Sequence, residues 1–334
     1  MTGPDSRGGA NSPEPVSPAP APRRGWSPGW LYAFIGVGFL GLLLSTRSSK
    51  GVVLYCAQDQ VFAEPLLAEF TARTGIRVKP VFDSEAVKTV GLANRLLAER
   101  EHPVCDVFWG NEEFRARQLA AAGIFVPTNG WAAFGHRSRC LVVRTNASGK
   151  PDEAFVPPRT LIELTNAACR GRVSMAFPLF GTTATHLLAL RQHWGESNWL
   201  AWCRAFASNK PFLEEGNSQV VRRVARGEAW VGLTDSDDVD AGQREGLPVA
   251  ALPPFAETLL IPNTVALVAK PGEASPEALQ LFAFLQSPAV TSALQQAGAL
   301  EIQSAPGAGL HPDWNRMVSE LDAASGQLTE VFRR

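Results

Sequence analysis

Three aspartates lie within four positions, at Asp235, Asp237 and Asp238, directly after the short apolar segment Trp230–Leu233. Carboxylates this close repel one another unless a cation or hydrogen-bond donors meet them. Their oxygens suit a hard cation, and they suit a hydrogen-bonding ligand equally well. A solvated acidic turn that caps the next helix is the simpler interpretation of the cluster alone. The cluster indicates a binding site only if other polar groups converge on it.

Two short segments at the expected starts of helices have the composition of an anion-binding site: Gly181, Thr182 and Thr183, and then Asn217 with Ser218. Free backbone N–H groups and the positive helix end favour an anion there, and the hydroxyl groups add donors. Ordinary helix capping accounts for either segment alone. The two segments together, combined with the acidic cluster, favour a ligand site.

Alternating strand and helix signals from residue 51 onward predict an α/β fold. We expect strands at 52–54, 76–82, 104–108, 139–144, 172–177, 230–233, 249–252 and 259–268. Helices are expected at 62–74, 87–101, 112–122, 161–168, 184–194, 199–207, 218–226, 276–286, 288–296 and 312–332. This alternation is typical of a largely parallel sheet flanked by helices. Ligands of such sheets bind beyond the carboxyl ends of the strands, where Asp59, Glu85, Trp109 and Asn111 also fall.

The composition argues against several functional classes. The chain has 334 residues, enough for two domains, and its formal net charge of −1 predicts no nucleic-acid partner. Its five cysteines are scattered singly without a CxxC pair, so we expect buried apolar side chains rather than a zinc or redox site. The sequence offers no credible Cys–His or Ser–His arrangement and no glycine-rich nucleotide loop, which predicts that the protein is not an enzyme and needs no cofactor.

The first fifty residues predict export. Residues 1–29 are rich in Pro, Gly and Ser and are expected to be disordered. The apolar run Trp30–Leu44, within the segment 30–45 that we expect to be a signal or anchor helix, would extend only about 22 Å, short of a bilayer core of about 30 Å. Arg23 and Arg24 precede it as in a secretory signal peptide, but no A-x-A cleavage site follows it. We therefore expect an uncleaved signal anchor in preference to a cleaved signal, which places residues 51–334 in the periplasm or otherwise outside the cytoplasm, anchored to the inner membrane.

Several segments carry a resemblance to a known family: VVLYCAQDQVFAEPLLAEFTARTGIRVKPVFDSEA at 52–86, CDVFWGNE at 105–112, GRVSMAFPLFGTTATH at 171–186, GNSQVVRRVARGEAWVGLTDSDD at 216–238, and IPNTVALV at 261–268. Over roughly residues 51–300 the chain resembles extracellular solute-binding proteins of ABC importers, with the type II periplasmic binding fold. The most similar branch contains the ferric-iron-binding proteins and their hexose-phosphate-binding and phosphonate-binding relatives.

This resemblance implies two lobes, each a mostly parallel sheet flanked by helices, joined by a two-strand hinge with the ligand in the cleft between them. Lobe one would comprise residues 51–139 and 262–300, lobe two residues 140–261, and residues 301–334 a C-terminal helical segment that packs on the lobes. The chain would leave lobe one near Arg139–Thr145 and return near Leu259–Asn263. The resemblance also implies a monomer that delivers a solute to an ABC importer permease and its ATPase.

The resemblance bears on the ligand through a few positions. Iron binders of this family use a histidine after the first strand, a glutamate after the third, and a tyrosine pair after the strand at 230–233. In this sequence the first two places hold Asp59 and Asn111, with Glu112 beside it, and the tyrosine pair falls on or near Asp237 and Asp238. The whole chain has only two tyrosines, at positions 32 and 55, so iron binding by a tyrosine pair is impossible.

We therefore expect ferric iron with a synergistic anion as the first candidate solute, with Asp59, Asp237 and Asp238 as metal ligands. The family commonly binds such an anion at helix starts. A phosphorylated or phosphonate organic solute, such as a sugar phosphate, is the alternative, with its phosphate at the helix starts and its hydroxyl or amine groups on the aspartates. A membrane-anchored sensory domain is a third interpretation, which the lack of an attached signalling domain disfavours.

Overall fold

The computed structural model describes residues 51–82, 88–151, 156–302 and 309–333. The chain divides into two units, Met1–Ser49 and Lys50–Arg334, and all the described residues belong to the second. The predicted tail at 1–29, the predicted anchor at 30–45 and the candidate residue Glu85 lie outside the described residues. Within the described ranges, no helix has both the length and the apolar character needed to cross a membrane.

The first half of the described chain alternates strands and helices, as predicted. Its elements are β1 (Val52–Cys56), α2 (Gln60–Thr74), β2 (Val78–Phe82), α3 (Lys88–Ala98), β3 (Val107–Gly110), α4 (Glu113–Ala121) and β4 (Trp131–Arg144). The predicted stop of the first helix is confirmed, because Gly75 adopts the left-handed conformation (φ 73°) and its N–H donates to the carbonyl of Thr71. Strand β4 begins at Trp131, eight residues before the predicted start, because its first part pairs with a distant strand.

The second half contains β5 (Val173–Ala176), α5 (Gly181–Trp194), α6 (Glu196–Ser208), β6 (Phe212–Glu214), α7 (Asn217–Ala225), β7 (Val231–Asp235), α8 (Ser236–Arg244), β8 (Val249–Ala251), β9 (Leu260–Leu267), α9 (Pro276–Leu285), α10 (Pro288–Gln296) and α11 (Trp314–Phe332). The predicted helix at 161–168 is wrong. Two short 3₁₀ helices, Ile162–Thr165 and Ala167–Cys169, take its place because the extended backbone of Asn166 separates them.

One sheet runs through the described chain in the strand order β2-β1-β3-β9-β4-β7-β5-β6, with β8 paired to β4. Strands β1, β2 and β3 are parallel to one another, as are β5, β6 and β7. The long strands β4 and β9 join the two groups: β4 pairs with β9 from Trp131 to Ser138 and with β7 from Arg139 onward. The predicted two-lobed α/β fold with a two-strand connection is thereby confirmed, whereas the lobe boundaries at 139 and 261 stay a prediction.

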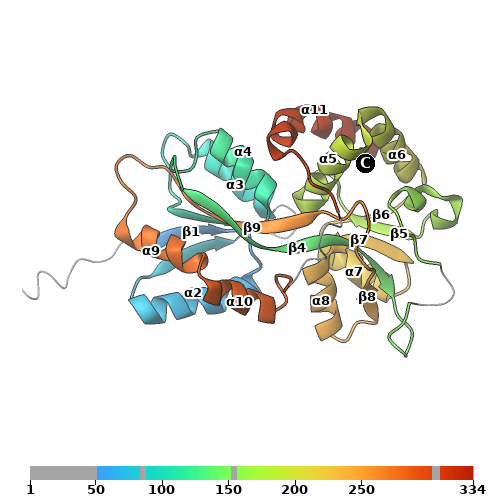
Figure 1. Ribbon diagram of the computed structural model, residues 1–334, viewed down its shortest axis with the longest axis horizontal. Coiled ribbons are helices and arrows are strands. Elements are labelled where there is room, and N and C mark those ends of the chain that lie inside the picture. The colour runs from blue at the N-terminus through green and yellow to red at the C-terminus, as the bar shows by residue number, and fades with distance from the viewer. Residues whose placement is uncertain (1–50, 83–87, 152–155, 303–308, 334) are drawn as a thin grey trace, which may run out of the picture. The chain divides into compact units, whose positions relative to one another are not determined.

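Helices cover both faces of each parallel group (Figure 1). Side chains of β1, β3 and β9 alternate between one core with α2, α9 and α10 and another with α3 and α4. Side chains of β4 and β7 alternate in the same way. Leu141 and Val143 face α5, α6 and α11, whereas Cys140 and Val142 face α7 and α8. All five cysteines are buried and free, which confirms the prediction of apolar side chains.

A bulge in β4 determines which of its side chains lie on the face of the sheet that α5 covers. The pairing register with β9 shifts between Phe134 and Arg137, and Gly135 within the shift has a positive φ of 52°. A side chain at Gly135 would also meet Leu300 at 2.5 Å. After the bulge, Arg137 and Arg139 continue the alternation of Leu141, so both guanidinium groups lie on the face that α5 covers.

Candidate functional site

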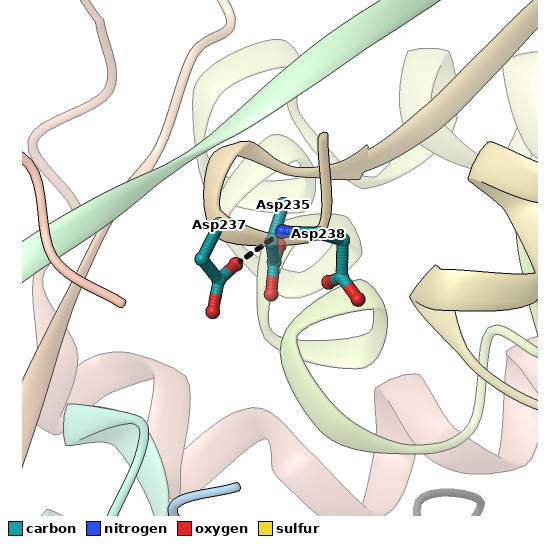
Figure 2. Close-up of side chains that lie close together, drawn as sticks. All are labelled: Asp235, Asp237 and Asp238. Carbon is teal, nitrogen blue, oxygen red and sulfur yellow. Dashed lines mark hydrogen bonds between the residues drawn. The ribbon is translucent and has the colours of Figure 1, made fainter. Parts of the chain in front are cut away.

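The acidic cluster lies where the buried strand β7 ends and α8 begins. Asp235 is the last residue of β7 and the N-cap of α8, and Asp237 and Asp238 belong to the first turn of that helix. One carboxylate oxygen from each of the three lies within 4.8 Å of the others. Figure 2 shows the side chains leaving this turn in the same general direction, with the N–H of Asp238 donating to Asp237 Oδ1 at 3.1 Å. The predicted cluster therefore comes together in three dimensions.

Asp235 is the buried member of the cluster, and it is fully engaged. Arg139 Nη1 donates to its Oδ1 at 2.6 Å, and Arg137 Nε, Thr182 Oγ1 and Asn217 Nδ2 donate to its Oδ2 at 3.2, 2.8 and 3.2 Å. Burial alone would raise the pKa of this carboxyl. The two guanidinium groups, with the hydrogen bonds from Arg139 and Thr182, outweigh burial and hold the pKa below its usual value. Asp235 is therefore an ionised carboxylate inside the protein.

Arg139 connects this carboxylate to the two helix starts. Its side chain is fully buried, and it donates to the hydroxyl groups of Thr182 and Thr183 at 3.3 Å and to Asn217 Oδ1 at 3.1 Å. Gly181, which opens α5, has a positive φ of 55°. Two of the predicted segments, around Thr182 at the start of α5 and Asn217 at the start of α7, thus meet on one guanidinium group.

Arg137 links the cluster to the other parallel group of strands. It forms an ion pair with Asp237 at 3.3 Å, and it donates to the carbonyl of Asn111 at 2.5 Å and to Asn263 Oδ1 at 3.3 Å. Burial alone would lower its pKa, but nearby aspartates outweigh burial and raise it; these are Asp237, Asp235, Asp238 and Asp59. Asp59, after β1, and Asn111, after β3, therefore lie near the acidic cluster, as predicted from strand ends.

The remaining predicted residues have different surroundings. Trp109 is fully buried in the core with α2 and α9, so its ring is not exposed for stacking on a ligand. Ser218 is half-buried in the first turn of α7. Glu85 lies outside the described residues.

Sequence reasoning missed two charged residues of this region, Arg137 and Arg139, and named Glu112 only as the neighbour of Asn111. Glu112 precedes α4, is fully buried, and accepts a hydrogen bond from Thr185 of α5. Burial raises its pKa, although Arg115 and Thr185 act in the opposite direction. The signal for the two arginines was their spacing, because i and i+2 in a strand share a face. This spacing alone does not show which buried group the two arginines meet, and Arg137 lies before the predicted strand at 139–144.

Comparison with known proteins agrees with this architecture. The family model described as bacterial extracellular solute-binding protein matches residues 52–300. No curated protein matches the chain.

Solved structures with the same fold include both iron-binding and sugar-phosphate-binding proteins. Iron-bound HitA from Pseudomonas aeruginosa has a TM-score of 0.70 at 19% identity, over 84% of this chain and 99% of its own. The ferric binding protein from Campylobacter jejuni has a TM-score of 0.70 at 16% identity, over 85% and 100%. The periplasmic binding protein AfuA from Actinobacillus pleuropneumoniae, with fructose-6-phosphate bound, has a TM-score of 0.70 at 17% identity, over 85% and 99%. At such identities the likeness establishes the fold and not the solute.

Proposed function

Because this chain belongs to the bacterial extracellular solute-binding proteins, we propose that it captures a cationic solute, with ferric iron as the first candidate, through Asp237, Asp238 and Asp59. Family membership implies the solute-binding component of an ABC importer, which acts outside the cytoplasm and hands its cargo to a membrane permease. It also implies that the protein binds its solute without converting it.

The carboxylate spacing at the β7–α8 turn carries this proposal. A hard cation collects oxygen ligands at about 2.0–2.6 Å, so two of its ligands are at most about 5 Å apart. One carboxylate oxygen from each of the three aspartates lies within 4.8 Å of the other two. Asp235 already accepts four hydrogen bonds, which leaves Asp237 and Asp238 as the members we assign to the cation.

The surroundings of these two aspartates are compatible with a cation. The side chain of Asp237 is 11% exposed, and its Oδ2 lies 3.3 Å from Arg137 while its Oδ1 accepts the N–H of Asp238. Each carboxylate oxygen has two lone pairs, so a hydrogen bond to an oxygen does not exclude a metal bond to the same oxygen. Asp59 would add a ligand from the end of β1, in the interlobe cleft that the resemblance implies.

Elemental analysis of protein purified without chelator tests the proposal. We expect about one iron per chain in the wild type, and we expect the double variant Asp237→Ala, Asp238→Ala to bind Fe(III) at least roughly tenfold more weakly. Asp240→Ala is the matched control, because Asp240 lies in the same helix with an exposed side chain. Loss of iron in the control, or no tight Fe(III) binding by the wild type, would contradict the proposal.

A phosphorylated or phosphonate organic solute is the second candidate. The observation in its favour is the fold shared with AfuA, whose structure has fructose-6-phosphate bound. Native mass spectrometry of the purified protein separates the candidates. A phosphate ester that co-purifies, in protein without iron, would replace the first candidate by the second.

Membrane attachment and oligomeric state complete the proposal. We propose that residues 30–45 anchor the protein to the inner membrane and that the solute-binding part is a monomer. Intact mass of the exported protein reports whether the segment is retained, and light scattering of residues 51–334 reports the number of chains. A mature mass that begins after residue 45 would overturn the anchor.

A further inference from the structure

The donor groups at the starts of α5 and α7 converge on a carboxylate of the chain itself. Asp235 Oδ1 accepts from Arg139 at 2.6 Å. Its Oδ2 accepts from Thr182 at 2.8 Å and from Arg137 and Asn217 at 3.2 Å each. Two guanidinium groups, a hydroxyl and an amide are the donors that proteins commonly use to hold phosphate or carboxylate. We refer to Arg137, Arg139, Thr182 and Asn217 as the oxyanion seat.

The oxyanion seat is filled and mostly buried, and Asn217 is its half-buried member. Asp235 is 2% exposed and Arg139 is 0% exposed. Thr183, which accepts from Arg139, is 1% exposed. An external anion would have to displace the Asp235 carboxylate and move it into solvent through a packed interior. All four donors of the seat already bind Asp235, so a second oxyanion would find them occupied.

We propose that Asp235 is a built-in anion, whose carboxylate replaces an external oxyanion in the seat, so that the solute is captured without a phosphate or carbonate bound there. This rests on the proposed function for the identity of the solute and not for the filling of the seat. It makes Asp235 a specificity-determining residue rather than a ligand of the cation. It also excludes the phosphate group of an organic solute from the α5 and α7 helix starts.

The charge balance explains why this residue is an aspartate. A buried guanidinium group without an anion is strongly destabilising, and Asp235 is the carboxylate that pairs with Arg139, whereas Arg137 also pairs with Asp237. Shortening Asp235 to alanine would leave both arginines facing a space where the carboxylate was. A small oxyanion from solution would then be attracted to the same donors, in the way that chemical rescue restores a deleted group.

Thermal unfolding of the wild type and the Asp235→Ala variant in phosphate and in chloride, at equal ionic strength, tests the inference. We expect the wild type to unfold at the same temperature in both salts. The variant should unfold at a higher temperature in phosphate, by roughly 5 °C when phosphate is at a hundredfold excess over its Kd. Asp235→Asn, which keeps the shape without the charge, should show no such preference because the seat remains occupied.

The outcomes separate this inference from the proposed function, because none of them involves a metal. A wild type that binds phosphate in calorimetry, with loss of that binding in Thr182→Val, would overturn the inference. So would an alanine variant that folds and shows no preference for phosphate over chloride. If the variant folds only when refolded in phosphate, that supports the inference. If it folds in neither salt, the wild-type calorimetry decides: no heat of phosphate binding is the expected result.

Discussion

Two buried carboxylates, Asp235 and Glu112, are equally hidden from solvent and have opposite pKa shifts. Asp235 ends β7 and Glu112 follows β3, so each lies at the end of a strand in its own parallel group. The pKa of Asp235 is lowered although burial opposes this. The pKa of Glu112 is raised, with burial as the largest cause. Burial alone therefore does not decide which of the two carries a charge.

The difference lies in the distance and number of the cationic donors. Asp235 has guanidinium nitrogens at 2.6 and 3.2 Å from two arginines. Glu112 has one arginine, Arg115, at 3.9 Å, and its Oε1 has no hydrogen-bond partner among the described residues. A carboxylate in low dielectric stays ionised only when close opposite charges replace its hydration. The β7–α8 turn has this arrangement and the β3–α4 turn does not.

Among these variants, we expect removal of the Arg139 guanidinium group to reduce the free energy of unfolding most. We expect Arg139→Met to lower the free energy of unfolding by about 3–5 kcal/mol, because it leaves a buried carboxylate with one guanidinium group instead of two. Urea unfolding of both proteins measures the difference. Arg226→Met is the control, since its ion pair with Glu228 is at the surface and should contribute less than about 1 kcal/mol. Equal losses in the two variants would show that the buried Arg139–Asp235 ion pair contributes no more to stability than the surface pair.

His186 is a third buried titratable group, and it should make the free energy of unfolding depend on pH in the acidic range. Burial, and then the charge of Arg139, lower the pKa of His186 to about 3. The unfolded chain therefore binds more protons than the folded protein between pH 6.5 and 3, so stability falls as the pH falls through this range. We expect a loss of about 2 kcal/mol between pH 6.5 and pH 5. His186→Gln should flatten this part of the profile of unfolding free energy against pH; an unchanged slope would assign the loss to other groups.

Glu112→Gln should have the smallest effect. The raised pKa favours the protonated acid, and a glutamine has the same shape and no charge. We expect a change of roughly 0–1 kcal/mol near neutral pH, far below that of Arg139→Met. Above the ordinary glutamate pKa, the folded protein binds more protons than the unfolded chain, so the stability of the wild type falls as the pH rises. The variant lacks this titration, so its free energy of unfolding should increase relative to that of the wild type over the same range. A deficit of the variant that grows with pH would mean that Glu112 is ionised and paired.

The fold could be predicted from sequence because its signals are local. The alternation of apolar strands with helices, and stop signals such as Gly75, lie within a few residues of what they determine. The failures have equally local causes. The segment 161–168 was interpreted as one helix although Asn166 has an extended backbone, and the three residues of β6 are too few to show a pattern.

The site could be predicted only in part, because its decisive contacts are distant in the sequence. The aspartate cluster and the helix starts were visible as motifs. The partner of Asp235 was not, since Arg139 lies 96 positions away and a strand gives no sign of what its side chains will meet. Trp109 shows the converse. The sequence does not distinguish an aromatic residue at a strand end that stacks on a ligand from one that fills the core, as Trp109 does.

The position of β9 between β3 and β4 has a consequence for how the chain folds. Val107 of β3 pairs with Leu267, and residues 131–138 of β4 pair with β9 as well, so the sheet of the first group is incomplete until the chain has passed through β5, β6 and β7. The first group is therefore not a contiguous segment, and the core of the second group is completed by Met317, Leu321 and Phe332 of the C-terminal helix α11. We expect the two to melt as one cooperative transition, and a fragment that stops before β9 to be a substrate for proteases and chaperones rather than a small stable domain.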